Sequence, residues 1–488
     1  MENIETIFCL HLFLKDGKYR NNFFASIFFK KMDIYMSDYS EEDSSEEDPS
    51  TADYSEQGLT ALPKLSSQIE ILYCSENELT RLPRLPNGLV VLNCTSNQLT
   101  LLPELPDTLT ELTCSSNALT KLPYLPDDLE TLECEENQLE ELPELLPYEL
   151  KSLLCGHNQL TVLPDLPPNL TMLCCYNNKL RSLPDLPPRL TLLECNDNVL
   201  TFLPELPNSI TRIFCQNNQL TDLPDLPRKL KDLNCDDNQI TFLPSLPSSV
   251  RRLECNNNQL TYLPPLPAIC EELFCNNNQL TVLPDLPPNL TYLECNNNQL
   301  TVLPAFPPRL SVLECNNNLF TILPHIPPNM RVVRCFENNI IQIDDLSSAS
   351  IYVEINTNNL NLDSLKKYKA HLLRFAKFLD KTKTQEILNN IDERIEFLNF
   401  QLVSGRNREI SVSNTNETVQ TANIDLIQSY MTSHKSNRNG MGMGTRKSNK
   451  RMKNKGHKRS YKRKQTKGKR IRNPYKRSQN KRTKNKRG

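Results

Sequence analysis

Between residues 59 and 362, apolar and polar positions follow a repeating pattern that returns at every twentieth position. One unit, residues 273–292, has the sequence LFCNNNQLTVLPDLPPNLTY. Its first three residues alternate between the two sides of the chain, which predicts a short β-strand. The prolines of its second half exclude a helix and predict an extended, polyproline-like return leg. Since one unit cannot bury its apolar edge alone, about 15 units must stack into a parallel-strand solenoid.

The cysteines mark this period along the chain. Fourteen of the 17 stand at every twentieth position from Cys74 to Cys335, with a single one-residue insertion after Cys134. The extra residue falls within 145–148, where the usual LPxLP is broken, and a fifteenth unit has Ile355 in place of the cysteine. We expect these thiols to pack as small buried hydrophobes between leucines, with disulfides as the alternative. A metal site is disfavoured because no CxxC spacing accompanies them.

An asparagine stands three residues after each of these positions, from Asn77 to Asn358. A buried amide can satisfy backbone groups that a turn leaves unpaired, so we interpret this ladder as structural. Cys9, Cys174 and Cys270 lie off the cysteine ladder. Cys174 falls at an outward-facing strand position and is therefore the candidate for an exposed, reactive thiol.

The unit resembles the leucine-rich repeat, LxxLxLxxNxL, with cysteine at the third apolar position. Its length and LPxLP half are similar to the repeats of type III secreted bacterial effectors of the YopM and IpaH families. It also looks like the predicted leucine-rich repeat proteins of giant amoeba-infecting viruses. The resemblance implies an α/β horseshoe-type fold and a host-directed binding role. Some of these effectors are ubiquitin ligases with a C-terminal catalytic cysteine, but no cysteine follows Cys335, so that activity is not implied.

The N-terminal segment 1–58 is acidic, and we expect it to be largely disordered. Met36 opens a soluble-looking sequence and is a possible true start of the protein. The apolar run from Ile7 to Leu14 is short and lacks the positive charge of a signal peptide. Together with the many free cysteines, this predicts an intracellular protein in the reducing cytoplasm or nucleus, not one secreted through a signal peptide.

After the repeats, three further segments are expected. Residues 363–404 form a helical cap, because apolar residues recur at helical spacing over 364–380 and 384–402. Such a cap covers the open end of a solenoid. Residues 405–434 are a polar linker, and residues 435–488 are a disordered basic tail with 24 Lys and Arg and no acidic residue.

The net charge of −2 hides a strong separation of charge. The repeats carry 17 basic and 36 acidic residues, a difference of −19, whereas the tail carries +24. The acidic solenoid predicts a protein partner with a basic surface. The tail predicts nuclear targeting or non-specific nucleic-acid contact. No segment is apolar enough to span a membrane.

The candidate partner-binding residues are acidic or aromatic and stand next to the ladder cysteines, on the concave face of the solenoid. They are Glu133, Glu135, Glu136, Tyr176, Glu194, Phe214, Asp236, Glu254, Phe274, Glu294, Glu314 and Phe336. The candidate tail residues form basic pairs and triplets. They are Lys458, Arg459, Lys462, Arg463, Lys464, Lys469, Arg470, Lys476 and Arg477.

No catalytic motif is present: the sequence lacks a Walker A loop, GxGxxG and HExxH, and its six His are scattered. We therefore expect no enzymatic activity, no cofactor and no metal. The favoured function is a monomeric protein-interaction scaffold with a targeting tail. The alternative is a nucleic-acid-binding or packaging protein in which the tail acts and the repeats are a spacer. Whether the tail meets nucleic acid, an import receptor or the repeat face stays open.

Overall fold

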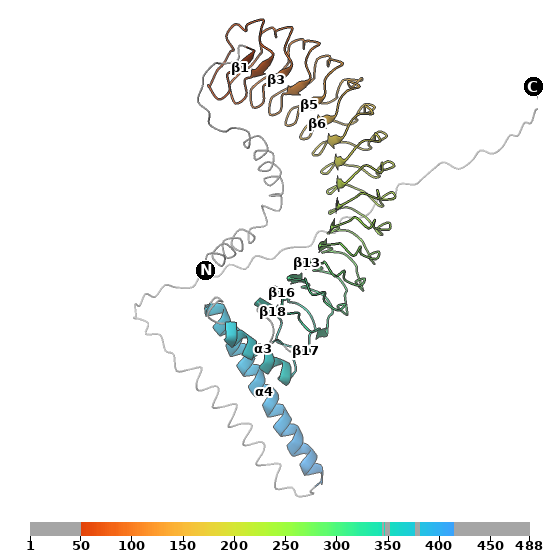
Figure 1. Ribbon diagram of the computed structural model, residues 1–488. Coiled ribbons are helices and arrows are strands. Elements are labelled where there is room, and N and C mark those ends of the chain that lie inside the picture. The colour runs from red at the N-terminus through yellow and green to blue at the C-terminus, as the bar shows by residue number, and fades with distance from the viewer. Residues whose placement is uncertain (1–49, 344–345, 347–351, 376–380, 414–488) are drawn as a thin grey trace, which may run out of the picture. The chain divides into compact units, whose positions relative to one another are not determined.

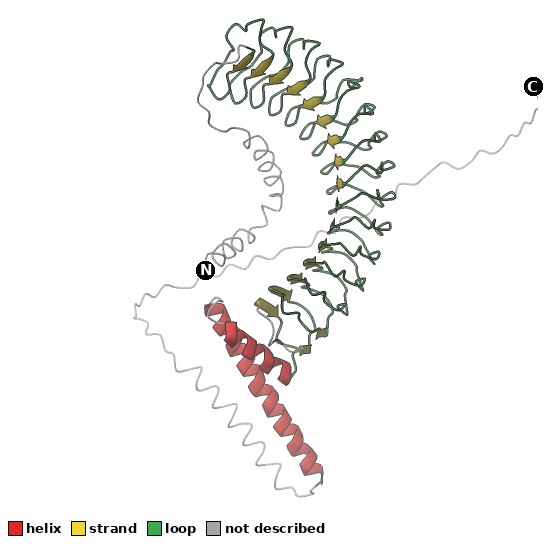
Figure 2. Cartoon of the chain, in the orientation of Figure 1, coloured by secondary structure: helices red, strands yellow, loops and turns green. Residues whose placement is uncertain are grey.

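The computed structural model describes residues 50–343, 346, 352–375 and 381–413. Short parallel strands follow one another in chain order and form a 16-stranded sheet (Figure 1). A second, two-stranded sheet pairs β15 with β17. Loops connect the strands of the solenoid, and helices occur only after the last strand of the described part (Figure 2).

Most strands have three residues and lie 20 positions apart along the chain. They are β1 (Thr51–Asp53), β2 (Ile71–Tyr73), β3 (Val91–Asn93), β4 (Glu111–Thr113), β5 (Thr131–Glu133), β6 (Ser152–Leu154), β7 (Met172–Cys174), β8 (Leu192–Glu194), β9 (Arg212–Phe214), β10 (Asp232–Asn234), β11 (Arg252–Glu254), β12 (Glu272–Phe274), β13 (Tyr292–Glu294), β14 (Val312–Glu314), β15 (Ile322–Leu323), β16 (Val332–Cys335), β17 (Gln342–Ile343) and β18 (Tyr352–Ile355).

The core repeats from one turn of the solenoid to the next. In the turn that contains β12, Leu273 and Cys275 point inward from the strand and are fully buried. Leu280 and Leu290 are fully buried as well and close the interior from the return leg. Since neighbouring strands are paired in register, Leu273 lies opposite Leu293, and the apolar side chains form one continuous core.

The chain leaves each strand through a left-handed turn. The second residue after each ladder cysteine has a φ between 50° and 58°, for example 55° at Asn277. Asn and Asp occupy eight of these positions, which agrees with their tolerance of this conformation. The proline-containing return legs of the turns before β15 contain neither helix nor strand, as the sequence predicts.

The residue inserted after Cys134 is absorbed by the return leg. Leu145 projects into solvent with 83% of its surface exposed. The strands on either side of it keep their register, with Thr131 opposite Ser152 and Leu132 opposite Leu153. The sheet therefore continues without a break through the irregular turn.

The N-terminal boundary predicted at residue 59 is too late. Residues 51–53 form β1 and pair with β2, so part of the segment predicted as disordered belongs to the sheet. Tyr54 takes the place of the ladder cysteine in this turn, and the amide oxygen of Asn77 accepts hydrogen bonds from the backbone of Gln57 and Leu59. The strand that precedes the return leg over 59–65 is therefore β1. Its turn lacks the cysteine and the asparagine that mark the other turns.

Two helices follow the sheet, as predicted. Helix α3 (Leu362–Phe375) buries Leu365 and Leu372 against the last turns, and the hydroxyl of Tyr368 donates to the carbonyl of Val353 at 2.9 Å. Helix α4 (Lys381–Ser413) buries Leu388 and Ile391 in the same core.

Helix α4 passes the predicted cap boundary at residue 404 and ends at Ser413. The first part of the predicted linker is therefore helical. The rest of the linker, the basic tail and residues 1–49 lie outside the described residues.

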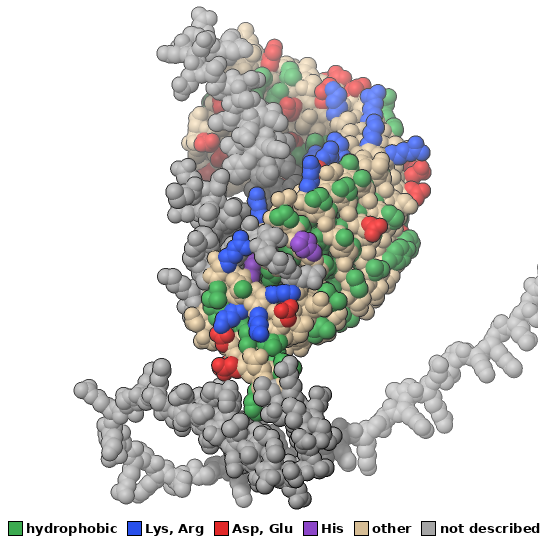
Figure 3. Space-filling view, turned by 60° about the horizontal axis from the view of Figure 1, so that its bottom comes forward, with side chains coloured by type: hydrophobic (Ala, Val, Ile, Leu, Met, Phe, Trp, Pro, Cys, Tyr) green, Lys and Arg blue, Asp and Glu red, His purple; other side chains and the backbone are tan. Residues whose placement is uncertain are grey.

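The solenoid also exposes a row of large hydrophobic side chains. Five successive turns expose a large hydrophobic side chain seven residues after the ladder cysteine. These are Phe242, Tyr262, Val282, Val302 and Ile322. Figure 3 shows hydrophobic side chains in rows among uncharged ones on one face of the molecule.

Candidate binding face

The strands line the inner side of the solenoid's curve, which we call the concave face (Figure 1). Three columns of side chains run along it. The strand-start column holds the residue three before each ladder cysteine, the strand-end column the residue before it, and the turn column the residue after it. Because the strands are parallel and in register, successive members of a column lie about 4.8 Å apart.

The structure places the predicted partner-binding residues in these columns. The strand-end column contains Glu133, Glu194, Phe214, Glu254, Phe274, Glu294 and Glu314. The turn column contains Glu135, Tyr176, Asp236 and Phe336. Glu136 follows in the left-handed turn, with a φ of 53°. Most of these side chains are half-buried, whereas Glu136 and Phe336 are exposed and Glu194 is buried.

Arg252 on β11 connects several of these residues. Its Nε donates to Oε1 of Glu254 at 2.7 Å, and its Nη1 pairs with Glu272 on the next strand. Its guanidinium also lies 4.8 Å from the ring centroid of Phe274. A planar cation can pair with a carboxylate and stack on a ring at the same time. Arg252 therefore joins the predicted residues Glu254 and Phe274 into one cluster.

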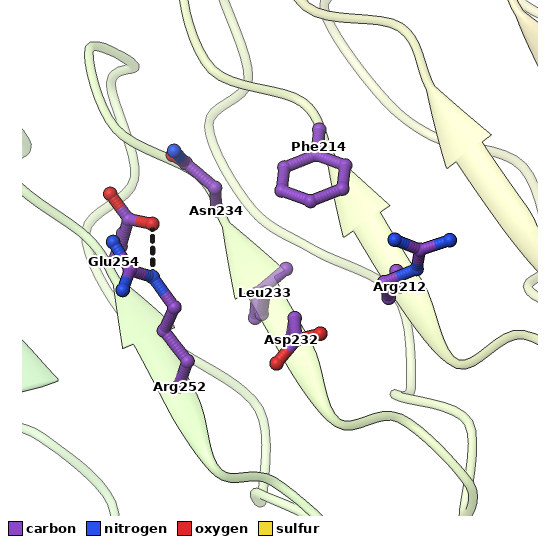
Figure 4. A pocket seen from close by; sticks show the side chains of 7 residues that line it. All are labelled: Arg212, Phe214, Asp232, Leu233, Asn234, Arg252 and Glu254. Atoms are coloured by element: carbon purple, nitrogen blue, oxygen red, sulfur yellow. Dashed lines mark hydrogen bonds and ion pairs between the residues drawn. The ribbon is translucent and has the colours of Figure 1, made fainter. Parts of the chain in front are cut away.

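A small hollow opens beside this cluster, over β9, β10 and β11 (Figure 4). It is lined by Arg212, Phe214, Asp232, Leu233, Asn234, Arg252 and Glu254. Burial raises the pKa of Asp232, while the neighbouring Arg212 and Arg252 oppose that rise. The hollow is therefore lined by groups of both charges and by one aromatic ring.

The last turns of the concave face repeat this mixture of charge and ring. Arg334 pairs with Glu314, and the hydroxyl of Tyr292 donates to Oε1 of Glu294 at 3.0 Å. Arg252, Tyr292 and Arg334 were not predicted, although each occupies a strand-start or strand-end position. The alternation of strand residues places all three on the same face as the predicted acidic residues and was therefore a sufficient signal for them.

Asp236 in the turn column is a carboxyl group with a strongly altered acidity. Burial raises its pKa to about 7, and the nearby Glu254 and Asp237 add to the rise. The backbone N–H and the side-chain amide of Asn256 donate to it at 2.5 and 3.0 Å, which opposes the rise. This group changes charge near neutral pH.

The Asn-Asn-Asn stretches of the later turns are internally hydrogen-bonded. In the turn column, the amide oxygen of Asn256 accepts from the backbone N–H of Asn276 at 2.7 Å. At the second position, the amide of Asn277 donates to the oxygen of Asn257 at 2.6 Å. At the third position, Asn278 is buried and bonds to backbone groups of two turns, which confirms the predicted structural role. These asparagines stabilise the solenoid.

The structure contradicts the prediction that Cys174 is an exposed thiol. Cys174 does face outward from β7, but it is only 5% exposed. An apolar cluster on the concave face covers it, formed by Leu154, Met172, Cys174, Tyr176, Leu192 and Phe214. Burial raises its pKa well above the ordinary value, and Glu194 and Glu135 raise it further. Side chains of neighbouring turns hide it, because the inner side of the curve brings them together.

The ladder cysteines are core residues. All 16 cysteines of the described residues are buried free thiols. Burial raises the pKa of Cys74 and of Cys114 to about 12. In several turns the thiol also donates to a backbone carbonyl of the next strand, as from Cys235 to Glu254 at 3.3 Å. Thiols with such raised pKa values are protonated at neutral pH and unsuited to nucleophilic attack.

Three further points concern metal ions, membranes and the basic tail. The described residues contain no group of three His, Cys, Asp or Glu side chains that could hold a metal ion. Over the same residues, no helix combines the length and hydrophobicity needed to cross a membrane. The basic tail residues from Lys458 to Arg477 lie outside the described part of the chain.

Comparison with solved structures identifies similar solenoids. YopM from Yersinia enterocolitica aligns at 27% identity and a TM-score of 0.50, over 69% of this chain and 98% of that one. YopM from Yersinia pestis, described as a leucine-rich effector protein, aligns at 33% identity and a TM-score of 0.53, over 64% and 87%. A leucine-rich repeat protein of Leptospira interrogans shares the fold at 23% identity and a TM-score of 0.50, over 66% and 94%. No family model and no curated protein matches the sequence.

Proposed function

Because the chain belongs to the leucine-rich repeat proteins with YopM-type repeats, we propose that it is a non-enzymatic scaffold that binds a protein partner on its concave face. One observation carries this proposal. The core and asparagine positions are nearly the same in every turn, whereas the strand-start and strand-end positions differ between turns. For example, Arg252, Tyr292 and Val312 occupy one column. Side chains that vary over an otherwise regular sheet form a distinct pattern for a partner to recognise.

The charge of this face favours a partner with a basic surface. From β2 to β8, the three columns include Glu111, Glu133, Glu135 and Glu194 and no Lys or Arg. Arginines occur only from β9 onward, and two of them, Arg252 and Arg334, pair with carboxylates. A surface of one sign steers a partner of the opposite sign toward it.

The absence of enzymatic activity belongs to this proposal. The cysteine that faces the concave side, Cys174, is buried with a raised pKa, so it is a poor nucleophile. YopM from Yersinia pestis is described as a leucine-rich effector protein, and the likeness of its repeats to this chain supports a binding role.

We further propose that the basic tail localises the complex through nuclear import or nucleic acid. Its 24 basic residues without one acidic residue support non-specific phosphate contact. In the alternative function, the tail itself is the active element and the solenoid only a spacer.

Affinity capture from host lysate, with nuclease treatment, tests the scaffold function. The full chain is compared with the double variant Glu133→Lys and Glu294→Lys on the concave face. The matched control is Asp225→Lys and Asp285→Lys, which makes the same charge change at exposed positions of the return legs. We expect the concave variant to lose the captured proteins and the control to retain them. Equal capture by all three chains would refute binding at this face.

A further inference from the structure

The most distinctive part of the concave face lies over β7, β8 and β9. We call it the Tyr176 site and define it by Glu135, Tyr176, Glu194, Asn196 and Gln216. Tyr176, Glu194, Asn196 and Gln216 come from the successive turns of β7, β8 and β9. Glu135 belongs to the turn of β5 and joins the site through its hydrogen bond with the Tyr176 hydroxyl. The apolar cluster around Cys174 and Leu192 forms the floor beside them.

The position of Tyr176 is determined by the turn before it. A Cβ atom at Gly156 would lie 2.7 Å from two ring atoms of Tyr176, so the ring rests on a position that only glycine leaves open. The ring of His157 meets it edge-on, with centroids 5.2 Å apart. The Tyr176 hydroxyl hydrogen-bonds to Glu135, and Glu135 and Glu194 join burial in raising its pKa. Two carboxylates thus lie near the hydroxyl of Tyr176.

The hydrogen-bond ladder of the turn column is interrupted at this site. In later turns each side-chain oxygen accepts from the next backbone N–H, as Asn276 accepts from Asn296 at 2.7 Å. The oxygens of Asn196 and Gln216 are buried and have no hydrogen-bond partner among the described residues. Asn196 is only 2% exposed, and its amide nitrogen donates to Asp197 at 2.7 Å. Buried acceptors without donors are rare in native proteins.

We propose that the Tyr176 site binds an arginine side chain from an extended segment of the protein partner. This inference rests on the proposed function and specifies the chemistry of its partner. A guanidinium carries five donors in a planar fork. Its donors satisfy the oxygens of Asn196 and Gln216, its charge pairs with Glu194, and its plane stacks on Tyr176.

Arginine fits this set of groups better than lysine does. A lysine ammonium offers three donors around one point, whereas the acceptors belong to two different strands and their turns. The half-buried Phe214 and Gln216 are the side chains that rotate to admit the ligand, as interface side chains commonly do on binding. A partner residue with apolar neighbours also covers the exposed parts of Met172 and Phe214.

Fluorescence anisotropy with the full chain and labelled peptides tests this inference. The probe is a Gly-Ser peptide with a central Arg-Leu-Arg, compared with the same peptide carrying lysine or citrulline in place of arginine. Citrulline keeps the planar shape but removes the charge. We expect citrulline to weaken binding by at least about tenfold and lysine by about threefold to tenfold.

Two variants locate the binding to the site. Glu194→Gln removes the charge and should weaken arginine-peptide binding by about tenfold or more. Gln216→Met removes a buried oxygen that lacks a donor, so folding is preserved, and binding should still weaken by about threefold or more. The exposed Glu205→Gln and Gln219→Met are the matched controls, and affinity should stay within about twofold for both. Circular dichroism melting verifies the fold of each variant.

Unchanged affinity in the folded Gln216→Met variant, or equal binding of the citrulline peptide, would overturn the arginine site. The scaffold function is tested separately, by capture from lysate, and is refuted if the full chain, the concave double variant and its control capture the same proteins equally. If the Glu133 and Glu294 reversal abolishes capture while the Tyr176 variants bind normally, the partner uses another part of the concave face. If capture is lost in the Tyr176 variants as well, both proposals are supported together.

Discussion

The side-chain oxygen of Asn278 accepts a hydrogen bond from the backbone N–H of Leu260, which lies 3.0 Å away in the preceding turn. Its nitrogen donates to the carbonyls of Cys255 and Cys275 at 2.9 and 3.3 Å. One side chain thus satisfies backbone groups of two turns, and equivalent asparagines repeat this arrangement through the described solenoid.

Replacement of Asn278 by Ala should therefore destabilise the turns around it. Four backbone groups, the N–H of Leu260 and the carbonyls of Cys255, Cys275 and Asn276, lose a hydrogen bond, which we expect to cost about 2–4 kcal/mol. Hydrogen exchange should show lost protection of the Leu260 amide, since its acceptor is gone. The control Gln279→Ala, at an exposed position of the same turn, should leave that amide protected. Equal exchange in both variants would contradict the structural role of the ladder.

Alkylation tests the burial of the cysteines. In the native chain at pH 8, we expect Cys174 to react with iodoacetamide as slowly as the ladder thiols, because burial and Glu194 keep it protonated. Mass spectrometry of the digested protein measures modification at each cysteine. Unfolding in urea should make all of them reactive. Rapid native labelling of Cys174 alone would show that the apolar cluster does not cover it.

The raised pKa of Asp236 predicts a pH-dependent contribution to stability. Its ordinary pKa is 3.8 and its pKa in the folded chain is about 7, so the folded state binds its proton more tightly than the unfolded state does. The contribution is therefore fully present below about pH 4 and is lost as the pH rises through about 7. Between pH 5 and pH 8 we expect a loss of about 2–3 kcal/mol from this group.

The variant Asp236→Asn isolates that contribution. Asparagine occupies the same column in the next turn, where Asn256 accepts from a backbone N–H as Asp236 does, so the substitution fits the turn. Urea unfolding of both chains at pH 5 and pH 8 gives the difference in stability. The parent should lose more stability than the variant on going to pH 8. Parallel pH profiles would mean that Asp236 titrates normally.

Helix α3 covers the C-terminal end of the core. Leu365 is fully buried under it, whereas Leu373 on the same helix is 55% exposed. We expect Leu365→Ala to destabilise the last turns by about 2–4 kcal/mol, because a buried cavity replaces the side chain. Leu373→Ala should cost less than about 0.5 kcal/mol. Thermal melting measures both, and similar melting temperatures would show that the helix does not stabilise the solenoid.

Salt and truncation test the basic tail. If the tail contacts phosphates, affinity for a short random-sequence DNA duplex should fall by about 10³-fold between about 50 and about 200 mM salt. Deletion of residues 435–488 should remove this binding and leave capture of the protein partner intact. Salt-independent binding would contradict a phosphate contact. Loss of partner capture on deletion would favour the alternative in which the tail is the active element.

The regular period of the repeat was sufficient to predict the strands, the core and the asparagine ladder, because each depends on local alternation and stacking. The first strand was missed, since Tyr54 and Gln57 replace the two residues that mark the other turns. The return leg over 59–65 could have predicted this strand, because in the other turns of the solenoid a strand comes before each return leg.

Contacts between turns could not be predicted in the same way. The sequence shows that Cys174 faces outward, but its burial depends on how closely side chains of adjacent turns approach on the concave side. The environment of Asp236 likewise arises from Asn256 and Glu254, which both belong to the next turn of the solenoid. The predicted acidic residues were placed on one face, whereas their arginine and hydrogen-bond partners required the three-dimensional arrangement.

The irregular turn at Leu145 also has a practical consequence for protein engineering. Its additional residue extends the outer loop while Thr131 and Ser152 stay paired. We therefore expect that a fluorophore, an affinity tag or an inserted domain can be attached at this loop without altering the spacing of the strands. The molecule offers a ready attachment point on the side opposite to its sheet.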